Sequence, residues 1–583
     1  AAPEPATHLF TKMKSSHTGI EFRNDVTYTE SFNIYTYRNF YNGGGVAVGD
    51  INNEGLPDLF FCSNQHSNKL YLNKGDLRFE DITEKAGVGS TEVWSTGVTF
   101  ADVNGDGWQD IYVCKSGDLR GKRRGNELFI NNGNGTFTER AAAYGLDNRG
   151  LSTHAAFFDY DNDGDLDAYL LNNSFRSVGN YDLVPGQRHF PDPMGGNKLY
   201  RNDSGHFTDI TQEAGMYSSR IGFGLGVTIA DINRDGWQDI YVSNDFFEKD
   251  YLYINQQNGH YLECLEQYIR EISLSSMGAD IADINNDGYP EIYVTDMLPE
   301  TEARIKTKTN FDNWDKYQSD IHNGYYKQFV RNTLQLNTGP LQRTDTNAAA
   351  AYFSEIGRFA GVCATDWSWG ALIADLDNDG WKDIFVANGI FKDITDQDYI
   401  QYTASSAGAI RAQILNKEEN IVKKLVDLIP SNAVSNYAFC NNGNLTFTNR
   451  AAEWGLDEPS FSNGSAYGDL DNDGDLDLVV NNVNMPCFVY RNESRQLHPE
   501  NNYLRIHLQG AGKNSAGIGA KVTVHYNGNK LAYQEQMPMR GFESTVDQRL
   551  TFGLGRNARI DSVVVLWPDG KKTLLPKVLP NQQ

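Results

Sequence analysis

The stretch that decides the fold is DYDNDGDLDA, residues 159–168, which places five aspartates within nine positions. The aspartates stand at relative positions 1, 3, 5, 7 and 9, and position 6 is Gly164. Two like charges about 4 Å apart repel by roughly 4 kcal/mol at an effective dielectric of 20, so a cation is needed to neutralise such a loop. Side-chain oxygens from positions 1, 3, 5 and 9, a carbonyl from position 7 and a glycine at the bend let a short loop wrap a hard cation. This ligand set favours calcium.

An EF-hand shares the D-x-D-x-D-G opening, but it needs a bidentate glutamate at position 12 and a helix on each side. Position 12 is Leu170, and the flanks HAAFF and AYLL are apolar runs of strand length. We therefore interpret the stretch as a calcium loop in a β-hairpin. The structural alternative is a solvated turn that is rich in aspartate for turn propensity alone.

Charge and hydropathy limit the classes of function. The chain of 583 residues carries 51 Lys and Arg against 76 Asp and Glu, a formal net charge of −25, which argues against a surface for nucleic acid or anionic membrane. No apolar run approaches the roughly 20 residues of a membrane-spanning helix. The opening AAPEPAT indicates a flexible tether of a trimmed or mature product whose targeting segment is missing.

The cysteines give no sign of a zinc or redox site, because none has C-x-x-C spacing. Buried free thiols are favoured over disulfides for all six: Cys62, Cys114, Cys264, Cys363, Cys440 and Cys487. A protein with many calcium sites points to the outside of the cell, where calcium is abundant enough to fill weak sites.

The acidic loop recurs along the chain. Internal repeats are the strongest indication of a repeat architecture, so they are considered before other fold patterns. Seven copies begin at Asp50, Asp102, Asp159, Asp231, Asp283, Asp375 and Asp469. Each copy follows a small-residue apolar run such as GVTFA and precedes another such as IYV. A second marker, such as NKLYLNKGDLRFEDITEKAGV, alternates with the loops and has the pattern of paired strands around Asn/Gly turns.

One period thus holds about four short strands, which is the content of a β-propeller blade. The N-terminal HLFTKMKSSHTGIEF matches the second half of the second marker, and CFVYRNE at 487–493 matches only the first half. The two ends together complete a seventh blade and leave no open sheet edge. The predicted fold is all-β: a seven-bladed β-propeller over 1–495, closed by its N- and C-terminal strands, and a small C-terminal β domain over 500–583. Insertions are expected near 296–330 and 391–435, the second with helical apolar spacing.

The loops and their surrounding GVxxxDxDxDGxxDIYV pattern resemble FG-GAP or VCBS repeats, the calcium-loop blades that also build integrin α propellers. The tail from Asn501, with its turns NSAGIGAKV and LTFGLG, resembles the ASPIC/UnbV domain found after such propellers in bacterial surface proteins and in cartilage acidic protein. The chain stops where the last strand of that module should finish, so a longer native protein is expected.

The resemblance implies that positions 1, 3, 5 and 9 and the carbonyl of position 7 bind up to seven Ca²⁺ ions. The first loop is expected to be the weakest site, because Glu54 replaces Asp at position 5; the fifth ends in Glu291, which can still ligate. The ions are interpreted as structural. The predicted ligands are Asp50, Asn52, Glu54, Leu56, Asp58, Asp102, Asn104, Asp106, Trp108, Asp110, Asp159, Asp161, Asp163, Asp165, Asp167, Asp231, Asn233, Asp235, Trp237, Asp239, Asp283, Asn285, Asp287, Tyr289, Glu291, Asp375, Asp377, Asp379, Trp381, Asp383, Asp469, Asp471, Asp473, Asp475 and Asp477.

A partner surface is expected where the inner strands approach the axis. Five positions before each loop stand six glycines and His154, and small residues let seven strands crowd together. His154 is a candidate ligand-facing group, although a buried, hydrogen-bonded histidine is favoured. Nearby aromatic side chains suit stacking against sugars or gripping a peptide, or else blade-to-blade packing, which is slightly favoured. The candidate partner-binding residues are Trp94, His154, Phe223, Trp367, Trp369 and Phe461.

No nucleophile elbow, H-E-x-x-H, P-loop or dinucleotide fingerprint is present, so no catalytic residue is predicted. The favoured function is a non-catalytic, calcium-stabilised cell-surface protein that binds protein or glycan partners or acts as a scaffold. Membership of an outer-membrane complex, as one of its subunits, is among the expectations. By resemblance it is expected to be an outer-membrane lipoprotein of a Gram-negative bacterium, with a lipid anchor upstream of residue 1. The alternative is a calcium-dependent polysaccharide lyase or another carbohydrate-active propeller enzyme, using a Lys, Arg or His base.

Overall fold

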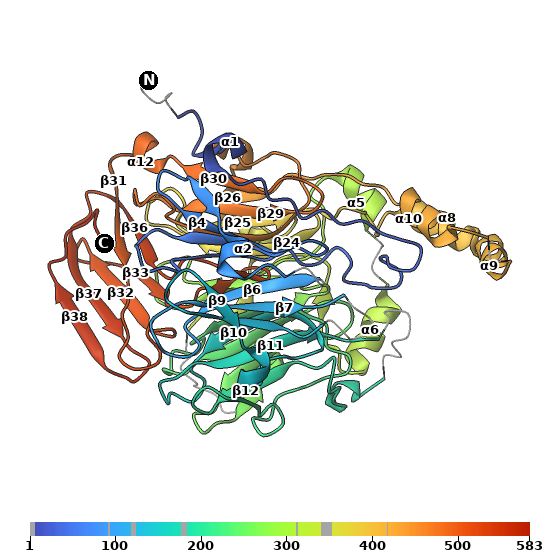
Figure 1. The fold of residues 1–583 in the computed structure, drawn as a ribbon, viewed down its shortest axis with the longest axis horizontal. Coiled ribbons are helices and arrows are strands. Elements are labelled where there is room, and N and C mark those ends of the chain that lie inside the picture. Colours follow the sequence, from blue (N-terminus) through green and yellow to red (C-terminus); the bar gives the residue numbers. More distant parts are fainter. Residues whose placement is uncertain are drawn as a thin grey trace.

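Seven four-stranded antiparallel units account for most of the computed structural model (Figure 1), which describes residues 6–90, 94–117, 124–176, 184–309, 313–339, 352–416 and 418–583. Of the tether expected over AAPEPAT, residues 1–5 lie outside the described residues. The first three blades are β2 (Val46–Gly49), β3 (Asp58–Phe61), β4 (Lys69–Asn73) and β5 (Phe79–Asp81); β6 (Ser95–Ala101), β7 (Asp110–Lys115), β8 (Glu127–Asn131) and β9 (Phe137–Glu139); β10 (Leu151–Phe158), β11 (Asp167–Asn173), β12 (Lys198–Asn202) and β13 (Phe207–Asp209).

The other four blades continue the same order. They are β14 (Gly224–Ala230), β15 (Asp239–Asn244), β16 (Tyr251–Asn255) and β17 (Tyr261–Glu263); β19 (Ala279–Ala282), β20 (Glu291–Val294), β22 (Thr333–Asn337) and β23 (Phe353–Glu355); β24 (Ser368–Ala374), β25 (Asp383–Asn388), β26 (Tyr437–Asn441) and β27 (Phe447–Asn449); and β28 (Ser462–Gly468), β29 (Asp477–Asn482) and β30 (Phe488–Asn492) with β1 (Phe10–Lys12). The first strand of every blade contacts the first strands of both neighbouring blades, so the sheets form a closed ring.

The two ends of the propeller sequence complete the last blade. Strand β1 pairs antiparallel with β30, with Phe10 opposite Asn492 and Lys12 opposite Tyr490. This confirms the closure predicted from the split hairpin marker. Each outer strand is followed by a short helix or turn, and these short helices are α1 (Ser15–Thr18), α2 (Thr83–Ala86), α3 (Ala141–Tyr144), α4 (Leu265–Tyr268), α7 (Gly357–Ala360) and α11 (Ala451–Trp454). Another short helix, α12 (Ser494–Leu497), follows β30.

Glycine is required in the inner strands because the inner strands of neighbouring blades approach one another closely. A Cβ added to Gly278 would lie 2.7 Å from the carbonyl oxygen of Trp369, and one added to Gly97 would lie 2.4 Å from that of Thr153. Real Cβ atoms essentially never come within 3 Å of a non-bonded atom, so these strands could not approach one another so closely with a larger residue at these positions.

The C-terminal domain has a small core of its own. Its strands are β31 (Asn501–Ile506), β32 (Lys521–Tyr526), β33 (Lys530–Glu535), β36 (Leu550–Arg556), β37 (Ile560–Leu566) and β38 (Lys572–Pro576). They form a β31–β36 pair and a four-stranded sheet in the order β33-β32-β37-β38, packed around residues such as Val522, Phe552 and Val563. In Figure 1 this domain lies on the left of the propeller.

Between β33 and β36 the chain leaves this domain and enters the propeller. It forms β34 (Met539–Arg540) and β35 (Ser544–Thr545), and β35 pairs with β2 so that the sheet of the first blade has six strands. At the tip, Phe542 packs against Trp369 with ring centroids 5.2 Å apart. The axis of the ring is therefore filled by a hairpin of the C-terminal domain, which the sequence did not predict.

The two predicted insertions contain the longer helices. The first holds α5 (Glu302–Lys308) and α6 (Trp314–His322); the second holds α8 (Gln397–Ser405), α9 (Ala407–Leu415) and α10 (Ile421–Leu428). Residues around the first also form a parallel pair, β18 (Ile272–Ser273) with β21 (Gln328–Phe329). Figure 1 shows α8–α10 projecting from the propeller on the side away from the C-terminal domain.

All six cysteines are free thiols. Four are buried, and Cys363 and Cys487 are half-buried. Burial raises the pKa of Cys62 and Cys114 well above the usual range, and the nearby Glu543 carboxyl raises both further. Such thiols are poor nucleophiles and behave as small apolar side chains.

Candidate metal centre

Each acidic loop joins the first and second strands of its blade. In the third loop, Asp159 directly follows β10 and Asp167 opens β11. The backbone N–H groups of Asp163 and Gly164 donate to the two carboxylate oxygens of Asp159, at 3.1 and 3.0 Å. The backbone N–H groups of Tyr160 and Asn202 donate to those of Asp167, at 3.0 and 2.8 Å. The strands thus hold positions 1 and 9 in fixed orientations.

The backbone of all seven loops follows one pattern. Position 4 has a positive φ in every copy, as at Asn162 (58°) and Asn472 (62°), and so does the glycine of position 6, as at Gly164 (95°). Asparagine tolerates the left-handed conformation better than most residues, and glycine adopts it without a Cβ penalty. Asparagine at position 4 in five loops and glycine at position 6 in all seven thus suit the loop geometry, and Gly105 and Arg234 adopt the same positive φ at position 4.

Three loops bring three carboxylates together. Within each set, one oxygen from each residue lies within 4.8 Å of the others, the separation expected for ligands of one ion: Asp159, Asp161 and Asp167; Asp375, Asp377 and Asp383; Asp469, Asp471 and Asp477. These are the loops with Asp at position 3. The other four have Asn there, and in three of them its Nδ2 donates to the position-5 aspartate, as from Asn104 to Asp106 at 2.9 Å.

Unpartnered oxygens show that the residues fit a cation. Oδ1 of Asp161 and Oδ1 of Asp471, both at position 3, are buried and accept no hydrogen bond among the described residues. A buried carboxylate oxygen without a partner costs free energy unless an ion or a water satisfies it. These oxygens, each beside two further carboxylates, have the hard-donor character that Ca²⁺ prefers.

Electrostatics within the loops also favour a cation. Burial, together with the neighbouring carboxylates of Asp161 and Asp163, raises the pKa of Asp159 to about 7. In the seventh loop, burial and the surrounding carboxylates raise the pKa of Asp473 to about 8. The charged forms are disfavoured without a counter-ion, so a divalent cation would stabilise the loops by restoring them.

The two loops with glutamate differ from the rest. The side chain of Glu54 in the first loop is exposed, and only its backbone N–H bonds within the loop, to Asp50 and Asn52 at 3.1 Å. Glu291 in the fifth loop is fully buried; its Oε2 accepts the N–H of Ile284 at 2.9 Å, and its Oε1 has no partner among the described residues. That the first site is weakest stays a prediction.

Neighbouring loops are linked by hydrogen bonds around the ring. In five loops the side chain at position 4 donates to the carbonyl oxygen of the position-6 glycine in the next loop. The five bonds run from Asn53 to Gly107 (3.1 Å), Arg234 to Gly288, Asn286 to Gly380 (2.8 Å), Asn378 to Gly474 (3.3 Å) and Asn472 to Gly55 (2.9 Å).

The chain of bonds is interrupted on both sides of the third loop. The second loop has Gly105 at position 4, without a side chain, and Asn162 of the third loop makes no such bond. The C-terminal domain supplies the missing donors: Asn514 N–H bonds Gly164 at 3.1 Å, and Lys521 Nζ bonds Gly236 at 3.3 Å. The glycine carbonyl of every loop therefore has a donor.

The C-terminal domain also reaches the position-1 carboxylates. Lys521 Nζ lies 3.0 Å from Asp231, and Arg505 forms an ion pair with Asp469. Ser515 donates to Asp102, and Gly553 packs against Asp375. The C-terminal domain thus covers the face of the propeller that carries the loops. Sequence reasoning missed these contacts, since the strand pattern of the domain does not reveal which basic residues face another domain.

The six candidate partner-binding residues lie deep in the fold, at 0 to 8% exposure. The aromatic ones belong to one cluster with Phe40 and Tyr41 of the N-terminal segment and with residues of the second insertion. His154 is fully buried, and burial lowers its pKa to about 4. The burial expected from the sequence is thus seen; a backbone contact with Val98 counters part of the lowering of the pKa, but neither ring nitrogen has a partner at full hydrogen-bond geometry among the described residues. Partner binding at these residues would require the N-terminal segment around Phe40 and Tyr41, or the second insertion, to move away from them.

Comparison with known proteins agrees with this architecture. An FG-GAP-like repeat model matches residues 50–113, 118–170, 179–242 and 231–294, and an ASPIC and UnbV model matches residues 510–583. Cartilage acidic protein 1 of Mus musculus is 23% identical over 90% of this chain and 70% of its own length.

Two further similarities are local. Cartilage acidic protein 1 of Xenopus tropicalis is 32% identical over 35% of this chain, a match that spans only 29% of that relative. Human integrin alpha-6 is 37% identical over 12% of this chain and 7% of its own length. These matches show FG-GAP-like repeats within residues 50–294 and an ASPIC and UnbV domain at residues 510–583. The closed ring continues the same acidic loops and four-stranded blades beyond residue 294.

Proposed function

We propose that the chain is a calcium-stabilised, non-catalytic binding or scaffold protein that acts outside the cell. The observation that carries this proposal is the set of three carboxylate triads, each within 4.8 Å, at the junctions between blade strands. Bound Ca²⁺ would supply the positive charge that these triads lack. Asp159, Asp375 and Asp469 would hold it at the end of an inner strand, and so connect the metal to the strands that form the ring.

A binding role is supported by similarity to integrin α chains and cartilage acidic proteins. Propeller rings are rigid supports, and recognition is placed on the loops and insertions that such supports carry. The helices α8–α10, which project from the ring, are the longest such insertion in the part of the chain described (Figure 1).

We place the protein at the cell surface, as an outer-membrane lipoprotein of a Gram-negative bacterium with protein or glycan partners. Among the described residues no helix combines the length and apolar character needed to cross a membrane. The proposal includes a lipid anchor upstream of residue 1.

Isolation of the native protein from cells tests the proposal. Surface proteins are crosslinked, purified through this chain in millimolar Ca²⁺ or in EGTA, and identified. The proposal expects extracellular neighbours that are recovered in Ca²⁺ and lost in EGTA. Calcium-dependent turnover of a polysaccharide by the pure protein, followed as unsaturated products at about 235 nm, would instead support an enzyme.

A further inference from the structure

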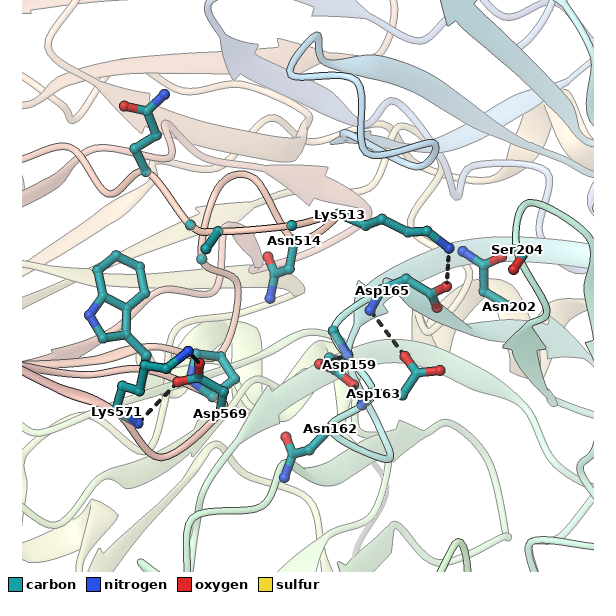
Figure 2. Close-up of a pocket in the computed structure, with 18 of the residues that line it drawn as sticks. Asp159, Asn162, Asp163, Asp165, Asn202, Ser204, Lys513, Asn514, Asp569 and Lys571 are labelled. Carbon is teal, nitrogen blue, oxygen red and sulfur yellow. Dashed lines mark hydrogen bonds and ion pairs between the residues drawn. The ribbon is translucent and has the colours of Figure 1, made fainter.

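A cleft lies where the third calcium loop meets the C-terminal domain (Figure 2). Its volume is about 810 Å³, and four segments line it: the third loop, the turn between β12 and β13, residues 509–517, and the turn between β37 and β38. Ligand sites occur preferentially at such boundaries between domains. The cleft is on the opposite side of the ring from the aromatic cluster around Trp94 and Trp367.

The interrupted ring of loop-to-loop bonds explains why the cleft lies at this loop. Asn162 occupies the position from which five other loops donate to their neighbours, yet its side chain has no hydrogen-bond partner among the described residues. Figure 2 shows Asn162 beside Asp163 and Asp159 at the floor of the cleft, with Lys513 and Asn514 of the C-terminal domain above them. The propeller leaves the Asn162 amide, with both donor and acceptor, available to a ligand.

Charges in the cleft disfavour an anion. Lys513 Nζ is paired with Asp165 at 2.9 Å, and Lys571 Nζ with Asp569 at 2.6 Å, so both lysines are already neutralised. Of the five lining aspartates, Asp203 is likewise paired, with Arg201 at 2.9 Å. The excess negative charge therefore belongs to the third loop, where Asp159 and Asp163 line the cleft beside Asp161 and Asp167 and none of the four has a basic partner among the described residues. An ion bound in the third loop would offset only part of this excess, so a carboxylate, sulfate or phosphate ligand would be repelled.

The remaining lining suits a ligand rich in hydroxyl groups. Asn162, Ser204 and Gln509 offer donors and acceptors together, and a hydroxyl group can use both. Trp567, half-buried, donates its Nε1–H to Thr573 at 2.9 Å and rests against Gly517, where an added Cβ would lie 3.0 Å from the indole. Its ring is thereby fixed at the wall of the cleft. A fixed indole beside polar groups suits the apolar face of a sugar ring.

We propose that this cleft binds a neutral saccharide, with Trp567 stacking on a sugar ring and Asn162 hydrogen-bonding its hydroxyl groups. The proposal rests on the binding function proposed above and assigns it a site and a ligand class. A basic peptide is the competing ligand, since its positive side chains could pair with the aspartates that line the cleft. Apart from Trp567, the lining offers only Ala511 and Pro568 as apolar side chains, which gives a peptide little to anchor on.

The test uses the full chain in millimolar Ca²⁺ against immobilised neutral, acidic and amino-bearing saccharides and a lysine-rich peptide. The best neutral saccharide is then titrated by calorimetry against wild type, Trp567→Ala and Asn162→Ala. Each variant is expected to bind at least tenfold more weakly. The matched control is Trp314→Ala, an indole 69% exposed on α6, which is expected to bind like wild type. Asn162 is not at a ligand position, so its variant should keep calcium binding and fold even if the Trp567 variant does not.

Several results would overturn the proposal: no neutral saccharide bound, preference for an acidic saccharide or for the peptide, or equal affinity in wild type and Asn162→Ala. Calcium-dependent recovery of surface partners that both cleft variants leave intact would refute the cleft and leave the proposed function standing. Loss of all calcium-dependent partners from wild type would refute the proposed function itself.

Discussion

The guanidinium of Arg540, on the hairpin of the C-terminal domain, pairs in two places with the carboxylate of Asp280 on an inner strand of the propeller. Nε lies 2.7 Å from Oδ1 and Nη2 lies 3.0 Å from Oδ2, across 260 positions of sequence. The Asp280 side chain is fully buried and that of Arg540 is 9% exposed. The pair fastens the hairpin inside the ring, so the two domains form one packed unit.

Removal of the Arg540 guanidinium should lower the stability of the whole chain. Arg540→Met leaves Asp280 buried without its partner, and breaking a buried pair in this way typically costs about 3–5 kcal/mol. The free energy of unfolding, measured with urea, should fall by that amount. The exposed pair of Lys306 with Glu302 provides the control, because Lys306→Met should cost under about 1 kcal/mol. Similar losses in the two variants would show that the hairpin is not fastened as described.

Close packing at the axis predicts a cost for one methyl group. In Gly370→Ala the new Cβ would lie 2.6 Å from Cβ of Phe542. Overpacking of this kind costs about 1–3 kcal/mol. Gly408→Ala in helix α9 meets nothing within 4 Å and should be neutral or stabilising by up to about 1 kcal/mol. Thermal denaturation of both variants checks the contrast, and an unchanged Gly370→Ala would mean that Phe542 does not reach the inner strands.

The loop-to-loop bonds predict different effects for two asparagines with the same backbone conformation. Asn286 (φ 59°) donates to Gly380 at 2.8 Å, whereas Asn162 (φ 58°) makes no such bond. The backbone cost of alanine is therefore matched, and the difference between Asn286→Ala and Asn162→Ala isolates the bond. We expect Asn286→Ala to be less stable by about 1 kcal/mol in calcium-saturated protein. Equal stabilities would contradict a stabilising role for the ring of bonds.

Asp250 predicts a specific pH dependence. Burial raises its pKa to about 7, although it accepts hydrogen bonds from Tyr241 at 2.6 Å and Ser276 at 2.8 Å. A carboxyl with a raised pKa in the folded state holds its proton there more tightly than when unfolded. The stabilisation of the folded state by protonated Asp250 is therefore fully present below about pH 4 and is lost as the pH rises to about 7.

The free energy of unfolding should decrease over that range by at most about 1.4 kcal/mol per pH unit from this one group. Asp250→Asn removes the titration. The free energy of unfolding of wild type minus that of Asp250→Asn, measured in calcium between pH 4.5 and 7.5, should fall as the pH rises. A difference that is flat with pH would show that Asp250 is charged in the folded protein.

The repeat made the propeller predictable, because its evidence is carried by local residues. Seven copies of an acidic loop at the same place in a strand pattern fixed the number of blades, and the split marker at residues 487–493 fixed the closure. The glycines at positions such as Gly97 pointed to crowded inner strands. None of this required knowledge of contacts between distant residues.

The docking of the C-terminal domain was not predictable, because it depends on contacts that no local pattern encodes. Arg540 and Glu543 stand in a short polar hairpin, and nothing in MRGFES distinguishes an exposed turn from one inserted into a ring. Both carboxylate oxygens of Glu543 are in fact buried without a partner among the described residues. The cleft at the third loop was missed for a related reason, since Asn162 looks like every other position-4 residue until the ring of bonds is seen.

The central claim is that divalent ions hold the ring of blades together. The chain is first stripped of metal, and its thermal denaturation is then followed in millimolar Ca²⁺ and in excess EGTA; this comparison tests the claim most directly. When the free Ca²⁺ concentration is 100 times the dissociation constant of a site, binding there adds about 2.7 kcal/mol to the free energy of unfolding. Filling even the three triads should therefore raise the melting temperature by several degrees. Asp471→Ala, which removes the position-3 ligand of one triad, should retain only part of that increase. Identical melting temperatures in Ca²⁺ and in EGTA would contradict the account.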